Sequence, residues 1–145
     1  ETVAMAVRAK NLGMRVMINF HYSDSWADPG QQNKPAAWAS HSFTTLLTDV
    51  YNHTFEVLTA LKNAGVTPEW VQIGNETSDG MLWNSGKAST GGFGNYAKFI
   101  NSGTNAIKTF NSKDTRIILG PVVNLMNLTL KRVKRRSVQL IRRVG

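Results

Sequence analysis

The stretch RVMINFHYSDSWADPGQQ, residues 15–32, decides the fold class. Its first six residues are mostly apolar, with β-branched and aromatic members, which predicts a buried β-strand. Polar and aromatic residues follow at once, and Asp28-Pro29-Gly30 is a turn signal inside the loop that they form. In α/β enzymes, functional sites are built at the edge where parallel strands end. The stretch therefore predicts a strand that leads directly into a candidate site.

Helical and strand patterns alternate on both sides of this stretch. The predicted helices cover residues 2–12, 43–63 and 96–110, and the two further predicted strands cover residues 70–73 and 116–119. The helix over residues 43–63 has the clearest i, i+3, i+4 apolar spacing, and Gly65 and Pro68 follow it as stop signals. The crossovers are long enough for parallel strands. The sequence thus predicts an α/β fold, as part of either a (β/α) barrel or a doubly wound sheet.

The composition is that of a globular domain, with an unusual distribution of charge. The chain has 145 residues, 41% hydrophobic residues and no Cys, so it fits one core without a disulfide framework. No apolar run approaches the length of a membrane span, so no membrane partner is expected. Acidic and basic residues balance over residues 1–115, and the whole formal net charge of +8 comes from Arg116 and beyond. The basic character is therefore a property of the C-terminal segment and not of the whole domain.

A second polar run, VQIGNE at residues 71–76, follows the predicted strand at 70–73. Retaining cleavage of a glycosidic bond needs two carboxyl groups about 5–5.5 Å apart, one of which protonates the leaving oxygen. Glu76 is the candidate for that acid, and Asn75 offers an amide to a sugar hydroxyl. The alternative is a Glu76 that only caps or salt-bridges at a strand–loop junction.

The loop after the first strand carries the other candidate residues. Aromatic faces stack on sugar rings, while His and Asp side chains hydrogen-bond sugar hydroxyls, so this loop is a candidate sugar-binding segment. The candidate substrate-binding residues are His21, Tyr22, Asp24, Trp26 and Asp28, together with Trp83 in a later loop. The alternative is a packed loop in which the Asp residues cap turns and the tryptophans only anchor the chain.

Metal and cofactor chemistry find no support in the sequence. The three histidines, His21, His41 and His53, lack a metal-binding spacing, and Asp24 with Asp28 does not make a calcium loop. No glycine-rich phosphate-binding motif and no Gly-x-Ser-x-Gly turn are present. We therefore expect no metal and no cofactor.

Three motifs in order resemble the endo-β-1,4-galactanases of glycoside hydrolase family 53, also called arabinogalactan endo-β-1,4-galactosidases. They are FHYSDSWADPGQQNKPAAW at residues 20–38, QIGNE at 72–76 and GMLW at 80–83. The resemblance covers roughly residues 1–119. It implies part of a (β/α)8 TIM barrel, around strands three to five, from a secreted enzyme that cleaves galactan or arabinogalactan of plant cell walls with retention.

The same resemblance implies roles for individual residues. Glu76 corresponds to the general acid/base of the family, Asn75 would contact the sugar at the cleavage subsite, and the loop from His21 to Asp28 would build the cleft. The family's nucleophilic Glu follows a later strand, yet no Glu occurs after Glu76 in this chain. A complete barrel also needs at least about 200 residues. We therefore expect a fragment that is inactive and poorly folded alone, and whose open sheet edges favour self-association.

The C-terminal segment allows two interpretations. Residues 130–144 place apolar residues on one helical face with Lys and Arg around it, which predicts a basic amphipathic helix for nucleic acid or anionic membrane. The alternative, which we favour, divides the chain into a partial barrel domain at 1–119 and a basic tail at 120–145 that is not native family sequence, so nucleic acid is not the expected partner. A non-catalytic carbohydrate-binding or nucleic-acid-binding module remains the alternative function.

Overall fold

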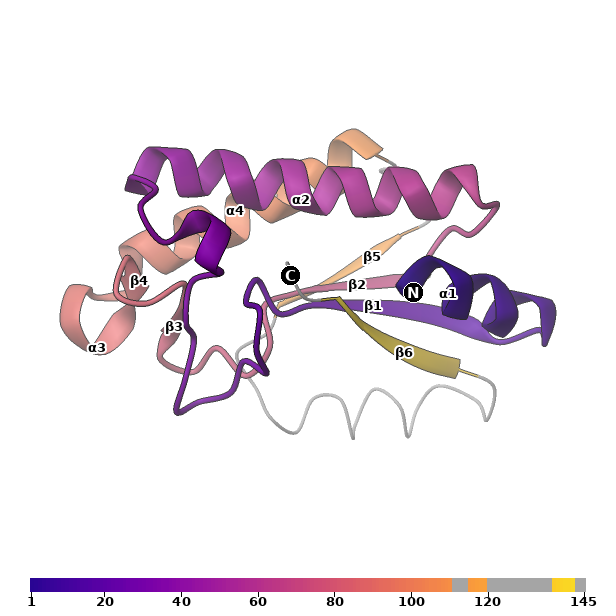
Figure 1. The fold of residues 1–145 in the computed structure, drawn as a ribbon, viewed down its shortest axis with the longest axis horizontal. Helices are drawn as coiled ribbons and strands as arrows, with labels where there is room; N and C mark the ends of the chain where they lie inside the picture. The colour runs from indigo at the N-terminus through magenta and orange to yellow at the C-terminus, as the bar shows by residue number, and fades with distance from the viewer. Residues whose placement is uncertain (111–114, 120–136, 143–145) are drawn as a thin grey trace.

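The structure is a computed structural model of the chain, and it describes residues 1–110, 115–119 and 137–142. Its centre is a four-stranded parallel sheet in the order β5-β2-β1-β6 (Figure 1). The strands are β1 (Arg15–Phe20), β2 (Trp70–Ile73), β5 (Arg116–Leu119) and β6 (Ser137–Arg142). The predicted α/β class with parallel strands is confirmed.

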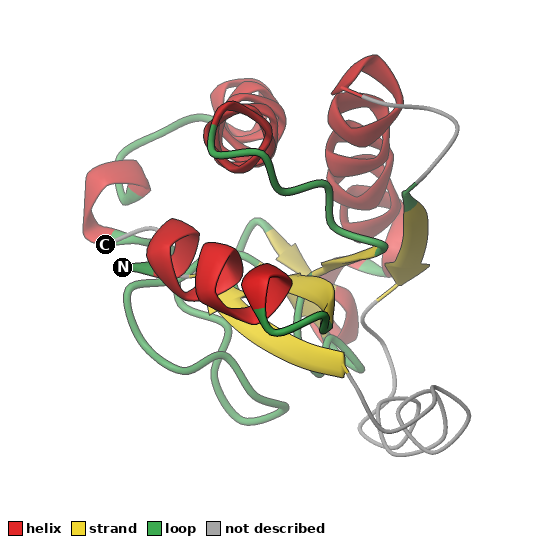
Figure 2. Cartoon of the chain, turned by 90° about the vertical axis from the view of Figure 1, so that its right-hand side faces the viewer, coloured by secondary structure: helices red, strands yellow, loops and turns green. Residues whose placement is uncertain are grey.

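Helices α2 (Phe43–Asn63) and α4 (Phe93–Phe110) cover one face of the sheet and pack on each other (Figures 1 and 2). Helix α1 (Thr2–Asn11) packs against β1 and β6. Alternate strand residues supply the core beneath the helices, because successive side chains of a strand point to opposite faces. These residues are Val16, Ile18 and Phe20 from β1, and Val71 and Ile73 from β2. None of the helices in the described part of the chain is long and apolar enough to cross a bilayer.

The opposite face of the sheet carries the polar strand residues. Asn19 of β1 lies in register with Gln72 of β2, and Met17 with Trp70. All four side chains are buried. In a closed barrel the residues that alternate with the helix-facing set point into the interior. The polar pair Asn19 and Gln72 therefore lies one step before the carboxyl end of the sheet, on its inner face.

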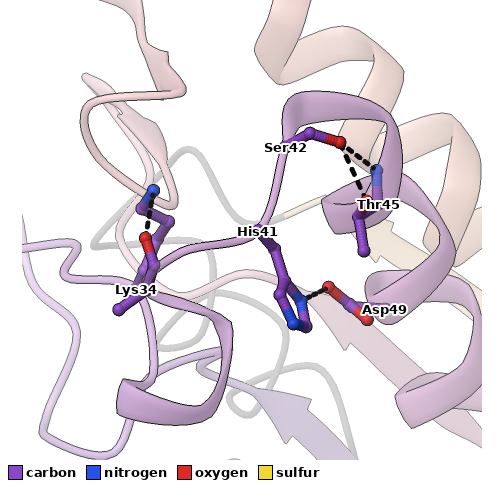
Figure 3. A network of polar contacts seen from close by, with 6 residues as sticks. Lys34, His41, Ser42, Thr45 and Asp49 are labelled. Atoms are coloured by element: carbon purple, nitrogen blue, oxygen red, sulfur yellow. Dashed lines mark hydrogen bonds and ion pairs between the residues drawn. The ribbon is translucent and has the colours of Figure 1, made fainter.

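Local capping explains why α2 begins where the sequence predicts. Ser42 is its N-cap, and the Ser42 hydroxyl accepts a hydrogen bond from the backbone N–H of Thr45 at 3.2 Å (Figure 3). The His41 Nδ1 atom lies 2.6 Å from Asp49 Oδ2 in the second turn, which ties the incoming loop to the helix. Just before them, the Lys34 ammonium donates to the carbonyl of Ala39 at 3.2 Å.

Four short elements lie outside the sequence predictions. The loop after β1 contains the short helix η1 (Ala36–Trp38). The loop after β2 folds into an antiparallel pair, β3 (Gly80–Met81) and β4 (Gly86–Lys87), followed by α3 (Ala88–Gly91). Each has four residues or fewer, too short for a hydrophobic period to show.

The C-terminal segment differs from the helical alternative. Residues 137–142 form strand β6, which pairs in parallel with β1 over its whole length, from Arg15↔Ser137 to Phe20↔Arg142. Leu140 is buried in the main core. The helical interpretation is therefore wrong for these six residues, because pairing with a strand far away in the sequence overrides local periodicity. The rest of the predicted tail, residues 120–136 and 143–145, lies outside the described residues, and the division at residue 119 stays a prediction.

Candidate active site

The loops that follow β1 and β2 meet at the carboxyl end of the sheet, at the left of Figure 1. An isolated parallel bridge between Asn33 and Trp83 joins them, and in it the Trp83 N–H donates to the carbonyl of Gln32 at 2.7 Å. The two sequence motifs that were predicted to form one site are thus neighbours in space, as expected for adjacent parallel strands.

Glu76 lies at the centre of this junction. Its backbone is in the left-handed region, with φ of +50°, which is unusual for a residue with a side chain. Gly74, two residues earlier, has φ of +79°, and a Cβ there would lie 2.7 Å from the Thr77 Cγ2 atom. The Glu76 side chain is half-buried. Within the described ranges no side chain or backbone group forms a hydrogen bond or ion pair with the Glu76 carboxylate. The alternative in which Glu76 caps a turn or forms a salt bridge is therefore not supported by these residues.

Asn75 is held from two sides and is nearly inaccessible, with 5% of its surface exposed. Its Nδ2 group donates to the carbonyl of Ala27 at 2.8 Å, and its Oδ1 atom accepts from Asn19 Nδ2 at 2.9 Å. Asn75 and Thr77 also spell a glycosylation sequon, but both are buried and the Asn75 amide is already bonded, which excludes modification in this fold.

Gln32 connects the two loops through its side chain, which is only 2% exposed. The Nε2 group donates to the carbonyl of Asn75 at 2.8 Å and to that of Asp28 at 3.1 Å, and lies 3.5 Å from the carbonyl of Glu76. Gln32 and Asn19 were not among the predicted site residues. The only sequence signal for Gln32 is its place in the long first motif.

The two predicted aspartates shape the loop. The Asp24 carboxylate accepts from the backbone N–H of Ala36 at 2.7 Å, at the start of η1. The Asp28 carboxylate accepts from the backbone N–H groups of Gly30 at 2.7 Å and Gln31 at 3.1 Å, which forms a tight Asx-type turn. These contacts match the alternative in which the aspartates cap turns.

Tyr22 requires a correction. Its ring is 1% exposed and stacks on Phe20 with centroids 5.4 Å apart, on the helix-facing side of the sheet. Its hydroxyl lies 2.8 Å from Thr54 Oγ1 of α2, and burial raises the pKa of the Tyr22 phenol, an effect that this hydrogen bond opposes in part. Tyr22 is therefore a core residue, and the structure separates it from the other candidates. The prediction of a substrate-binding role failed because the alternation of side chains between the two faces of the sheet continues past the end of β1. Tyr22 therefore lies on the same face as Phe20.

The three remaining predicted residues differ in accessibility. His21 is buried, accepts from the backbone N–H of Ala27 at Nδ1 (3.1 Å), and meets Trp26 edge-on with centroids 4.9 Å apart. Trp26 is 45% exposed. Trp83 is half-buried; its Nε1 group donates to the carbonyl of Asp79 at 2.9 Å, and the Lys87 ammonium lies 4.1 Å from its ring centroid. Trp26 and Trp83 therefore present the accessible aromatic surface.

The described residues hold no cluster of three or more His, Cys, Asp or Glu that could bind a metal ion. Asparagine, glutamine, glutamate and tryptophan dominate the junction, and they suit hydrogen bonding to hydroxyl groups, ring stacking and proton transfer. Such a donor set is typical of a carbohydrate site. Fold and site together define the class of protein: an α/β chain with the strand-end chemistry of a glycosidase.

Comparison with known proteins specifies the family. The family described as glycosyl hydrolase family 53 matches residues 1–138, and the chain belongs to this family. It is 43% identical over 106 residues to the arabinogalactan endo-β-1,4-galactanase of Thermothelomyces thermophilus, covering 73% of this chain and 31% of that enzyme.

Two solved structures agree with the fold. The chain matches the family 53 catalytic domain of Ignisphaera aggregans with a TM-score of 0.77 and 32% identity, over 96% of this chain and 40% of that one. It also matches a fungal β-1,4-galactanase with a TM-score of 0.74 and 41% identity, over 81% and 35% of the two chains. The match to part of these family 53 TIM-barrel domains confirms the partial barrel. The chain spans between 24% and 32% of the length of the curated relatives it matches.

Proposed function

We propose that this chain carries the acid/base half of a galactan-hydrolysing active site, with Glu76 as the proton donor. The observation that carries the proposal is the position of Glu76: it is a half-buried carboxyl at the carboxyl end of β2, with no bonding partner among the described residues. Its neighbour Asn75 is held by Asn19 and Ala27. A carboxyl on a rigidly held turn keeps a constant direction toward a bound substrate.

The reaction follows from the chemistry of retaining glycosidases. Glu76 protonates the glycosidic oxygen of a β-1,4-galactan chain while a carboxylate on the other side of the sugar attacks the anomeric carbon. Glu76 then takes a proton from the water that hydrolyses the glycosyl-enzyme intermediate. The residues of this chain after Glu76 include no glutamate that could be the attacking carboxylate. We propose that it belongs to a later barrel strand and that this chain alone does not turn over substrate.

Trp26 and Trp83 are the proposed sugar-stacking surfaces. Galactose has an apolar face that packs on aromatic rings, and the accessible rings lie in the two loops that flank Glu76. Lys87 covers part of the Trp83 ring, so the exposed remainder is the surface left for a sugar. Asp24 and Asp28 hold the loop rather than the ligand in this proposal. We also propose that the parent enzyme is secreted and acts on galactan of plant cell walls.

A segment graft tests the acid/base role. The matched segment of the Thermothelomyces thermophilus galactanase is replaced by the corresponding residues of this chain, and galactan hydrolysis is measured before and after Glu76→Gln. We expect the substitution to lower kcat by about 10²–10⁴-fold, the usual contribution of a general acid. Glu56→Gln on the exposed side of α2 is the matched control and should leave the rate unchanged. Undiminished hydrolysis with Glu76→Gln would reject the assignment.

A further inference from the structure

Strand β6 lies out of chain order in the parallel sheet. In a (β/α) barrel each strand pairs with the strand before it and the strand after it in the chain, and β1, β2 and β5 pair in that way. β6 follows β5 in the chain but pairs with β1, at the opposite edge of the sheet (Figure 1). The place that β6 takes is therefore not that of the next strand after β5 in a barrel.

The hand of the crossover connections shows which strand belongs in this place. Helix α2 connects β1 to β2, and α1 leads into β1. The two helices contact each other and share one hydrophobic cluster, so they lie on the same face of the sheet (Figure 2). Parallel strands joined by a helix connect with a right-handed crossover in nearly all proteins. A strand that leads into α1 therefore lies beside β1 on the side away from β2, which is where β6 lies.

β6 makes the contacts that a strand in this place needs. It pairs with β1 along the whole of that strand, from Arg15 to Phe20. Leu140 lies in register with Ile18 and is buried in the core cluster that also contains Ala6 of α1. Helix α1 contacts both β1 and β6, as a crossover helix contacts the two strands that it joins. β6 therefore substitutes in space for a strand that leads into α1.

Two features distinguish β6 from the strand whose place it takes. A strand joined directly to α1 needs only a short loop, whereas residues 120–136 separate β5 from β6, and closing a longer loop costs more conformational entropy. The segment from Arg116 onward also contains no acidic residue, and arginine pairs stand at 135–136 and 142–143, at the two ends of β6. Basic residues on an edge strand oppose its pairing with a further sheet. β6 is thus suited to cover the edge of β1 without extending the sheet.

We propose that β6 is an exchangeable edge strand. It covers the edge of β1 in this chain and leaves that edge when a strand that leads into α1 is supplied. The partner that fits the edge is therefore a parallel strand of a family 53 barrel, and assembly of such a strand with this chain requires the release of β6. The inference concerns the sheet alone and does not depend on the role of Glu76.

A disulfide between β1 and β6 tests the pairing, because the full chain contains no Cys. Arg15 and Ser137 are partners in register, and neighbouring strands lie about 4.8 Å apart, within the Cα separation that a disulfide spans. Arg15→Cys with Ser137→Cys should form an intrachain disulfide on mild oxidation. Arg15→Cys with Gln139→Cys is the matched control, because its Cα atoms lie about 8 Å apart, too far for a disulfide. Equal yields from the two pairs, or no disulfide in the first, would overturn the proposal.

Exchange is tested by fusing a barrel strand to the Arg15→Cys, Ser137→Cys variant ahead of Glu1. The fused residues are the strand and loop that lead into the helix corresponding to α1 in the Thermothelomyces thermophilus galactanase. We expect the rate of disulfide formation to fall by about tenfold or more, because the tethered strand holds the edge of β1 at high effective concentration. The same fused strand with proline at two central positions cannot pair and should leave the rate unchanged.

An undiminished rate with the intact fused strand would overturn the proposal. If the fused chain fails to fold, the same strand is added as a free peptide to the unfused cysteine variant. The rate of disulfide formation should then fall as the concentration of the peptide rises, and a constant rate would overturn the proposal.

Discussion

At the residue scale, the loop from His21 to Gln32 contains side chains that are bonded within the protein and side chains that stay accessible. The carboxylates of Asp24 and Asp28 are used by backbone N–H groups, and Gln32 spends its amide on the turn before Glu76. In this loop Trp26 stays exposed, and in the following loop Glu76 and Trp83 are half-buried. The polar side chains Asp24, Asp28 and Gln32 therefore hold the backbone of the two loops in place.

Tyr22→Phe tests the core placement of a residue that sequence alone assigned to the cleft. Loss of the hydrogen bond to Thr54 should lower the free energy of unfolding by about 1 kcal/mol, without weakening oligosaccharide binding in the graft. The raised pKa of Tyr22 adds a pH signature. Burial of the neutral phenol contributes to the free energy of unfolding at pH values below the unfolded-state pKa of Tyr22, near 10. This contribution is lost as pH rises from there toward the folded-state pKa. Denaturation at neutral and alkaline pH measures both effects, and a binding defect with unchanged stability would contradict them.

Substitution of Trp83 distinguishes sugar stacking from loop anchoring. In the graft carrying Glu76→Gln, Trp83→Ala should weaken binding of a galacto-oligosaccharide roughly fivefold, in line with about 1 kcal/mol for an aromatic contact. Trp83→Phe keeps a ring but loses the Nε1–H bond to Asp79. It should bind nearly as tightly as the unsubstituted protein in calorimetry. Equal loss with Phe and Ala would show that the anchoring bond, and not the ring, is what matters.

At the scale of elements, Gly86 of β4 lies close to a backbone carbonyl of β3 and to a side chain of α4, and these contacts fix the β3–β4 pair around the Trp83 loop. A Cβ on Gly86 would lie 2.4 Å from the Met81 carbonyl and 2.8 Å from the Phe99 ring of α4. Gly86→Ala should therefore destabilise the chain by about 1–3 kcal/mol, as overpacking does. Gly94→Ala is the control, because nothing lies within 4 Å of its Cβ. Chemical denaturation measures the free energy of unfolding of both variants. Equal values would contradict the close packing of Gly86 in the β3–β4 pair.

The helices and strands that the sequence predicted correctly are those whose signals lie within or next to the element itself. Helix α2 runs from Phe43 to Asn63 as predicted, because its periodicity, the Ser42 cap and Gly65 are all local. The position of Glu76 also followed from local sequence, since parallel strands end at one edge. Asn19 and Gln32 escaped prediction because their partners are an amide and backbone carbonyls that only the fold brings near. Strand β6 was missed for the same reason, as its partner Arg15 is far away in the chain.

At the scale of the whole molecule, β6 is one of the two edge strands of the parallel sheet and lies beside β1. Leu140 joins the main core from this strand, at 3% exposure. Leu140→Ala should cost about 2–5 kcal/mol of unfolding free energy if β6 belongs to the fold. Leu12→Ala, at a position that is 69% exposed, is the control and should be nearly neutral. Equal thermal unfolding midpoints for the two variants would show that residues 137–142 do not unfold together with the rest of the chain.

The central claim for the molecule is that Glu76 donates the proton to the leaving oxygen, and the dependence of rate on the leaving group tests it most directly. In the graft, the effect of Glu76→Gln is compared between galactan and a dinitrophenyl galactoside, whose leaving group needs no proton. We predict a loss of about 10²–10⁴-fold in kcat/KM for galactan and little loss in kcat/KM for the aryl substrate, because kcat/KM reports the cleavage step and not the later hydrolysis of the intermediate. An equal loss on both substrates would contradict the account, because Glu76 would then serve binding or folding rather than proton transfer.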